Sequence, residues 1–242
     1  ITGCFLEHDR DIVTAIYLLW TLVRVKGRVR PLTGANLHIR TMYSDGSEEV
    51  GQHKLGKSKV GSRGKIVGVD LVDSLESGST KRQEAQICAI DPVSADLVDT
   101  ADLIVFPMGS FFGSVAINLI PEGVGKAIVK RDCPKVYIPN TATDPEMYGY
   151  SIAECASLII DLVRQDAGEE TPAKDIIQFI LVDTKNCEYC VPINEQRILE
   201  LGIQLIDVNL VNEQQGSTDT TGRKHTRLDP EKVVEVLISL GT

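Results

Sequence analysis

The hydrophobic positions near the start of the chain follow a helical rhythm. Apolar residues recur at spacings of three and four along the segment, at Ile12, Ala15, Ile16, Leu19 and Val23. Asp9 and Asp11 lie near the positive end of such a helix, and Arg24 and Lys26 lie near the negative end. This pattern predicts a helix over residues 9–25.

From Asn36 the rhythm changes to strict alternation, which is typical of a β-strand. Leu37, Ile39, Thr41 and Tyr43 share one face, and the turn formers of residues 44–47 separate this strand from a second one over residues 48–53. A β-hairpin is therefore predicted, and the apolar run at residues 66–72 predicts another strand. We expect an insert over about residues 36–72 within one α/β domain that spans residues 1–242.

The segment between these strands is rich in basic residues and lacks apolar periodicity. Its cations stand among glycines and serines, at Lys54, Lys57, Lys59, Arg63 and Lys65. A solvated, mobile loop is the favoured interpretation. The alternative is a loop that closes over an anionic substrate.

The rest of the chain alternates between strand and helix patterns. Strands are predicted at residues 103–106, 136–138, 176–182 and 203–208, and helices at 93–100, from 113, 151–164, 193–201 and 230–240. Residues 74–88 between the two halves are ambiguous. Near-continuous apolar strands separated by helices indicate a parallel sheet covered on both faces. The predicted fold class is α/β, a Rossmann-like three-layer parallel sheet with a β-hairpin insert.

Charge and length exclude several classes of partner. The net charge of −9 over 242 residues argues against nonspecific binding to nucleic acid or to an anionic membrane surface. The longest apolar stretch, Ala15 to Val23, is too short to span a bilayer, and no basic segment precedes it. We expect a cytoplasmic protein with a small-molecule ligand.

The loops after the predicted strands carry the candidate chemistry, because ligands of open parallel sheets bind at the carboxyl ends of strands. After Phe106 come two Gly-Ser pairs, Gly109-Ser110 and Gly113-Ser114. Glycine lets the backbone approach a ligand, and hydroxyls and free N–H groups bind phosphate oxygens. The loop predicts a phosphate cradle, although a plain turn has the same composition.

The loop after the next strand is also polar. Asn140, Thr141 and Thr143 could hydrogen-bond a ligand, and Asp144 or Glu146 could act as a base or hold Mg²⁺. The alternative is a set of turn formers with acidic residues at a helix start.

Other motifs give weaker signals. Six scattered cysteines predict no disulfides, and we interpret Cys187 and Cys190 as incidental thiols, because one C-x-x-C pair without nearby histidines cannot complete a zinc site. The four histidines are dispersed, and no G-x-S-x-G elbow occurs. A hydrolase triad is not supported.

Three motifs follow one another at residues 102–114, 121–128 and 133–140. In this order they resemble the CofD-like family, which includes 2-phospho-L-lactate transferases and the gluconeogenesis-factor group. The match is supported by residues 11–31, 36–51 and 228–232. The usual G-P-G-S loop is replaced here by Phe106-Pro107-Met108-Gly109-Ser110. The resemblance implies that a nucleotide or nucleotide-linked small molecule, with Mg²⁺ as cofactor, binds at Gly109, Ser110, Phe111, Gly113, Ser114, Asn140, Thr141, Thr143 and Asp144. It also implies a possible homodimer.

Two family features do not occur in this sequence. Family members start with a strand and a G-G-T-G loop, followed by Asp-Asp-Gly-Gly, whereas this sequence starts at Ile1 and moves straight into a helical pattern. We expect that the numbered chain omits those elements. Three functions follow as hypotheses: a phospho-lactyl-type transferase, a non-catalytic regulator that binds a nucleotide sugar, and an interaction module with a decayed site.

Overall fold

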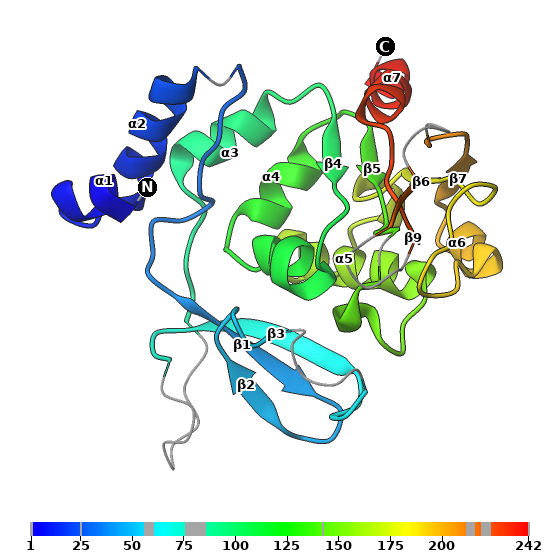
Figure 1. The fold of residues 1–242 in the computed structure, drawn as a ribbon, viewed down its shortest axis with the longest axis horizontal. Helices are drawn as coiled ribbons and strands as arrows, with labels where there is room; N and C mark the ends of the chain where they lie inside the picture. Colours follow the sequence, from blue (N-terminus) through cyan, green and yellow to red (C-terminus); the bar gives the residue numbers. More distant parts are fainter. Residues whose placement is uncertain are drawn as a thin grey trace.

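The computed structural model has a parallel sheet at its centre (Figure 1). It describes residues 2–24, 26–55, 61–75, 86–141, 143–211, 216–218 and 224–241. The parallel strands lie in the order β4-β5-β6-β7. Their bounds are Ile104–Phe106, Lys135–Tyr137, Phe179–Val182 and Gln204–Asp207. The predicted α/β class is confirmed.

Helices cover both faces of this sheet. Alternate residues of a strand point to opposite faces, so Tyr137 and Val136 of β5 enter different cores. Tyr137 packs with buried residues of α4 (Val124–Lys130), α5 (Ile152–Ala167) and α6 (Glu195–Glu200). Val136 packs with Val233 of α7 (Pro230–Gly241) on the opposite face. The three predicted layers are therefore present.

Local sequence signals fix where the flanking helices begin. Ser151 and Glu154 form a capping box that starts α5, in which each side chain bonds the backbone of the other residue. Asp91 caps α3 (Pro92–Asp99) by accepting from the N–H groups of Val93 and Ser94, and Pro92 occupies the first turn. None of the described helices is long and apolar enough to cross a membrane.

A separate antiparallel sheet is formed by β1 (His38–Tyr43), β2 (Glu48–Val50) and β3 (Ile66–Val72) in the order β2-β1-β3. The predicted hairpin is confirmed, and the strand predicted at residues 66–72 joins it. β2 ends at Val50, earlier than the predicted His53. Gly51 follows with a φ of +108°, a conformation that turns the chain and favours glycine.

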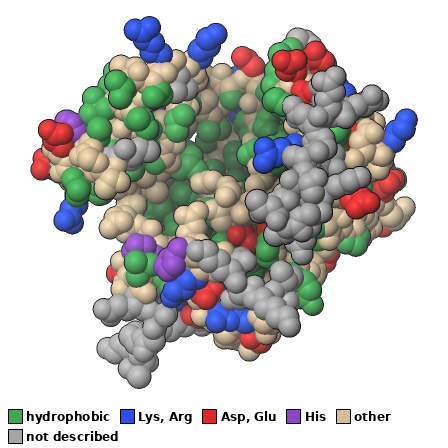
Figure 2. Space-filling view, viewed as in Figure 1, with side chains coloured by type: hydrophobic (Ala, Val, Ile, Leu, Met, Phe, Trp, Pro, Cys, Tyr) green, Lys and Arg blue, Asp and Glu red, His purple; other side chains and the backbone are tan. Residues whose placement is uncertain are grey.

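The helix predicted over residues 9–25 is α2 (Ile12–Val23) in the structure, which begins three residues later and ends two residues earlier, and an additional helix, α1 (Thr2–Glu7), precedes it. The two helices are separated by Asp9 and Arg10, which have φ values of 51° and 62°. Left-handed backbone stops helix propagation, and Asp11 then caps α2 by accepting from the Val13 N–H. Figure 2 shows hydrophobic side chains exposed on this part of the molecule.

The segment after β4 is less regular than the helix predicted from Gly113. It begins as a π-helical turn, η1 (Phe111–Val115), and continues as a 3₁₀ turn, η2 (Ala116–Leu119). Two short 3₁₀ turns precede α5 and β6, namely η3 (Pro145–Met147) and η4 (Ala173–Asp175). A further antiparallel pair that the sequence did not predict is formed by β8 (Gly216–Thr218) and β9 (Lys224–Thr226). Lys57 and Lys59 of the predicted basic loop, and residues 76–85 of the ambiguous region, lie outside the described residues.

Candidate functional site

The structure brings the two candidate loops together at the carboxyl ends of neighbouring strands. Phe106 at the end of β4 is opposite Tyr137 at the end of β5, and the Ile138 N–H donates to the Phe106 carbonyl at 2.9 Å. The loops over residues 107–114 and 139–146 therefore leave the sheet side by side, as the strand pattern predicted.

Two buried carboxylates from the second loop bind backbone amides of the first. The Phe111 N–H donates to Asp144 Oδ2 at 2.9 Å. The Phe112 and Gly113 N–H groups both donate to Glu146 Oε2 at 2.8 Å. Asp144 and Glu146 are each only 5% exposed. The amides that begin the π-helical turn are thus satisfied from within the protein.

The two carboxylates differ in how their oxygens are used. Asp144 employs both, because its Oδ1 also accepts from the Glu146 N–H at 3.0 Å. Glu146 concentrates both bonds on Oε2, and no hydrogen bond reaches Oε1 from any residue that the structure describes. Oε1 therefore has no donor among the described residues of the protein.

Burial sets the protonation behaviour of this pair. Burial raises the pKa of Glu146 to about 7, and the neighbouring Asp144 carboxylate adds to the rise, while the amide bonds from Gly113 and Phe112 oppose it. Burial also raises the pKa of Asp144, against the two amides that donate to it. A carboxyl group with a pKa near neutrality can exchange a proton at working pH.

Aromatic side chains pack beneath the first loop, which spans residues 107–114. The rings of Phe111 and Phe112 meet edge to face, with centroids 5.1 Å apart. Phe111 packs against Tyr137 at 6.5 Å, and Phe112 packs against Tyr150 at 5.8 Å. Both phenylalanines are buried, so the side chain of Phe111 belongs to the core and only its backbone faces the loop.

The antiparallel sheet lies against the same loops. A Cβ on Gly113 would meet Leu55 Cδ2 at 3.0 Å and Glu146 Oε1 at 3.2 Å, so this position has little room for a side chain. The Tyr150 hydroxyl donates to the carbonyl of Ile66 in β3. Lys65 Nζ lies 4.7 Å from the centre of the Tyr150 ring. Part of the predicted basic segment is therefore a neighbour of the candidate site.

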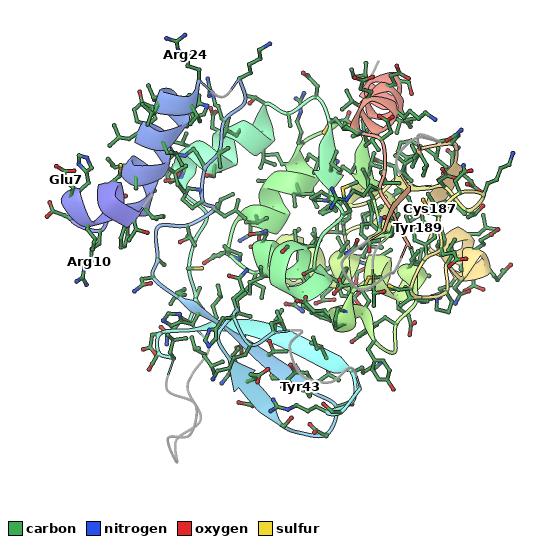
Figure 3. The ribbon with its side chains drawn as sticks, viewed as in Figure 1. Glu7, Arg10, Arg24, Tyr43, Cys187 and Tyr189 are labelled. Carbon is green, nitrogen blue, oxygen red and sulfur yellow. The ribbon has the colours of Figure 1, made fainter. Side chains whose placement is uncertain are left out.

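Arg63 of the same segment is engaged within the antiparallel sheet. Its guanidinium lies 3.4 Å from Glu49 and 5.5 Å from the centre of the Tyr43 ring. Tyr43, labelled in Figure 3, belongs to β1 of this sheet. The Arg63 charge is thus already balanced by an acidic partner.

The residues predicted to bind the ligand divide by accessibility. Ser110, Ser114 and Thr143 are exposed, and Gly109, Asn140 and Thr141 are half-buried, whereas Phe111, Gly113 and Asp144 are buried. The Ser114 N–H is taken by the Ser110 carbonyl at 2.9 Å. The predicted ligand contacts stay predictions, and the geometry divides them into groups that solvent reaches and groups that hold the loop.

The sequence indicated Glu146 as a candidate base or metal ligand. It did not predict the hydrogen bonds that Glu146 accepts from the loop over residues 107–114. An acidic residue shortly before a helix gives no sign of which amides it will meet. Within the described residues, no cluster of three His, Cys, Asp or Glu side chains could hold a metal ion.

The C-x-x-C segment lies elsewhere in the fold. Figure 3 places Cys187 and Tyr189 beside β6 and α6, away from Tyr43 and the antiparallel sheet. All six cysteines are free thiols. Burial raises the pKa of Cys187 to about 11, with a further contribution from Asp183. A thiol held protonated in this way is a poor nucleophile.

Comparison with known proteins agrees with the fold and the loop pattern. The family model described as 2-phospho-L-lactate transferase CofD matches residues 4–232. A Thermotoga maritima protein provisionally named a gluconeogenesis factor is 27% identical over 189 residues, which cover 76% of this chain and 51% of that protein. The gluconeogenesis factor of Listeria monocytogenes is 25% identical, over 97% of this chain and 66% of its own.

Solved structures show the same fold. A Bacillus halodurans protein of the UPF0052 family superimposes with a TM-score of 0.70 at 22% identity, over 98% of this chain and 70% of that one. The chain spans about half the length of the first curated relatives that it matches, with shares of 51%, 46% and 41%.

Proposed function

Because this chain belongs to the CofD family, we propose that it binds a nucleotide diphosphate or a related phosphorylated small molecule at the Gly109–Ser114 loop, as part of a 2-phospho-L-lactate transferase-like protein. One observation carries the proposal. The buried Asp144 and Glu146 hold the amides of residues 111–113, and the Gly109 and Ser110 N–H groups have no partner in the described part of the chain. Such a loop offers preorganised donors to an anion.

In the proposed mechanism the loop neutralises charge on the phosphate groups. The Gly109 and Ser110 amides and the hydroxyls of Ser110 and Ser114 bind phosphate oxygens, and Asn140 and Thr143 line the substrate side. Transfer of a phosphorylated group between a nucleotide and an alcohol depends on charge stabilisation more than on covalent catalysis. Phe111, Gly113 and Asp144 take part in the hydrogen bonds that hold the loop in place.

Mg²⁺ is part of the proposal only as a companion of the ligand. Both Asp144 oxygens and one Glu146 oxygen accept amide hydrogen bonds, and the described residues contain no group of three acidic, Cys or His side chains for the cation. Phosphate oxygens are the ligands that remain. No step of the reaction is assigned to the metal.

The site is proposed to be completed by polypeptide outside these 242 residues. The relatives are longer than the matched region, and the strand and the glycine-rich and acidic motifs expected from the resemblance are not in this sequence. An Asp-Asp pair upstream of Ile1 in the complete gene product would supply acidic groups for catalysis. A reading frame that begins at Ile1 would contradict this part of the proposal.

A second candidate is a regulator that binds a nucleotide sugar without turnover. It is favoured by the relatives named gluconeogenesis factor, such as that of Listeria monocytogenes. The same loop serves both functions, because binding a phosphate does not require a reaction. The identity of the nucleotide that binds distinguishes the transferase from the regulator.

Calorimetric titration of the complete gene product with GDP and with UDP-sugars, each with Mg²⁺, tests these functions, and the 242-residue chain serves as a comparison. Preferential GDP binding supports the transferase, and preferential UDP-sugar binding supports the regulator. Binding should be lost in a Gly109→Val, Ser110→Ala double variant and kept in Gly34→Val, since Gly34 has open space around it. No binding to any of these nucleotides would leave an interaction module as the remaining hypothesis.

A further inference from the structure

The hydrogen bonds of Glu146 leave one of its oxygens able to accept a proton without breaking any contact. Oε2 holds the Phe112 and Gly113 amides at 2.8 Å, and Oε1 accepts no hydrogen bond within the described residues. A carboxylic acid keeps a carbonyl oxygen as acceptor when its other oxygen is protonated. Asp144 has no such freedom, because each of its oxygens accepts an amide N–H.

An anion at the exposed end of the loop would lie close to this carboxylate. Glu146 bonds the amide of Phe112, which is two residues beyond Ser110. Consecutive Cα atoms are about 3.8 Å apart, so the Cα atoms of Ser110 and Phe112 are separated by roughly 7.6 Å at most. Phosphate charges held by the Ser110 amide would therefore repel the Glu146 carboxylate through a poorly hydrated interior.

We propose that binding of a phosphorylated ligand at the Gly109–Ser114 loop is coupled to the uptake of one proton by Glu146, at Oε1. An O–H bond forms there with a proton taken from the solvent, and no other bond breaks. The loop stays held by Oε2, while one negative charge under the ligand is removed. This coupling rests on the proposed function, since it requires an anion at the loop.

The surroundings of Glu146 single it out as the proton acceptor. Asp144 faces it from the same loop and adds negative charge. From β1, Tyr43 faces it with a phenol whose pKa is raised to about 12, chiefly by burial, so Tyr43 stays protonated. Of the nearby cations, Arg63 is paired with Glu49, and Lys65 lies over the ring of Tyr150.

The coupling has a measurable size. Burial already raises the pKa of Glu146 to about 7 in the free protein. If the bound anion raises that pKa by about one unit, roughly half a proton is taken up per ligand at pH 7.5. Affinity for the anion then increases about sixfold between pH 8.5 and pH 6.5. The direction is fixed, because proton uptake always favours binding at lower pH.

The test is calorimetry of the complete protein in two buffers with different ionisation enthalpies, with UDP-glucose as the first probe. The diphosphate of a nucleotide sugar is esterified at both ends and has no titrating phosphate group near neutral pH, so any proton taken up belongs to the protein. GDP is the second probe. For GDP, the difference between wild type and Glu146→Gln removes the proton chemistry of the nucleotide itself.

The expected result is a buffer-dependent binding enthalpy that reports net proton uptake in wild type and in a control variant, Glu188→Gln. This control alters an exposed glutamate within the C-x-x-C segment. Glu146→Gln should bind the ligand with no proton uptake and a flat pH profile. Binding of UDP-glucose by wild type with the same enthalpy in both buffers overturns the coupling, whether or not the variant folds. No binding of either nucleotide overturns the proposed function and the coupling with it.

Discussion

Replacing Glu146 with glutamine should change how the stability of the protein depends on pH. The carboxyl of Glu146 has a pKa of about 7 in the folded protein, against an ordinary value of 4.5, and burial is the main cause. A folded-state pKa above the unfolded value means that the folded protein holds this proton more tightly. The contribution to stability is therefore complete below about pH 4.5 and is lost as the pH rises through about 7.

The magnitude follows from these two pKa values. At pH 5.5 the folded protein retains the proton and the unfolded chain has mostly lost it, which stabilises the fold by about 2 kcal/mol relative to pH 8.5. Glutamine has no such proton, and its amide oxygen can still accept from the Phe112 and Gly113 N–H groups. The stability of the Glu146→Gln variant should therefore lack this part of its dependence on pH.

Urea unfolding followed by far-ultraviolet circular dichroism, at half-unit steps between pH 5.5 and 8.5, measures the difference. Other titrating groups contribute equally to both proteins, so the wild-type curve should fall by about 2 kcal/mol more than the Glu146→Gln curve over this range. The curve of stability against pH for Glu188→Gln, which alters an exposed glutamate, should be parallel to the wild-type curve. Parallel curves for wild type and Glu146→Gln would show that burial does not raise the pKa of Glu146 as argued.

Two further substitutions test the packing that positions the site. Gly125→Ala should destabilise the fold by about 1–3 kcal/mol in the same urea assay, because the added Cβ would lie 2.6 Å from the Val163 carbonyl oxygen of α5. Gly34→Ala should destabilise it far less, because Gly34 has open space around it. Equal unfolding midpoints for the two variants would contradict this close approach. Tyr150→Phe leaves the Ile66 carbonyl without this donor and should destabilise the fold by about 1–3 kcal/mol, with faster amide exchange in β3. Unchanged exchange there would show that this bond does not hold β3 against the loop before α5.

Much of the fold could be predicted from the sequence, because the spacing of apolar residues indicates which side of a helix or strand is buried. Apolar runs such as residues 103–106 and 136–138 predicted parallel strands, and the alternation from Leu37 to Tyr43 predicted the hairpin. Helix boundaries were less certain. The left-handed backbone of Asp9 and Arg10, which separates α1 from α2 and delays the start of the predicted helix, has no counterpart in hydrophobic spacing. The π-helical turn after β4 depends on amides being held from another loop, which no local pattern encodes.

The sequence by itself determined the α/β class, the loops in which chemistry was expected and the family to which those motifs point. It did so because strand order places consecutive loops at one edge of a parallel sheet, and because Gly109, Ser110 and Ser114 are residue types suited to phosphate. Only the tertiary structure decided what Asp144 and Glu146 do. Both were candidates for touching a ligand, and the structure shows that both accept hydrogen bonds from backbone amides more than 30 residues away in the chain. Their burial, and with it the raised pKa of Glu146, arises where the loop over residues 139–146 packs on the loop over residues 107–114, and such packing exists only in the folded molecule.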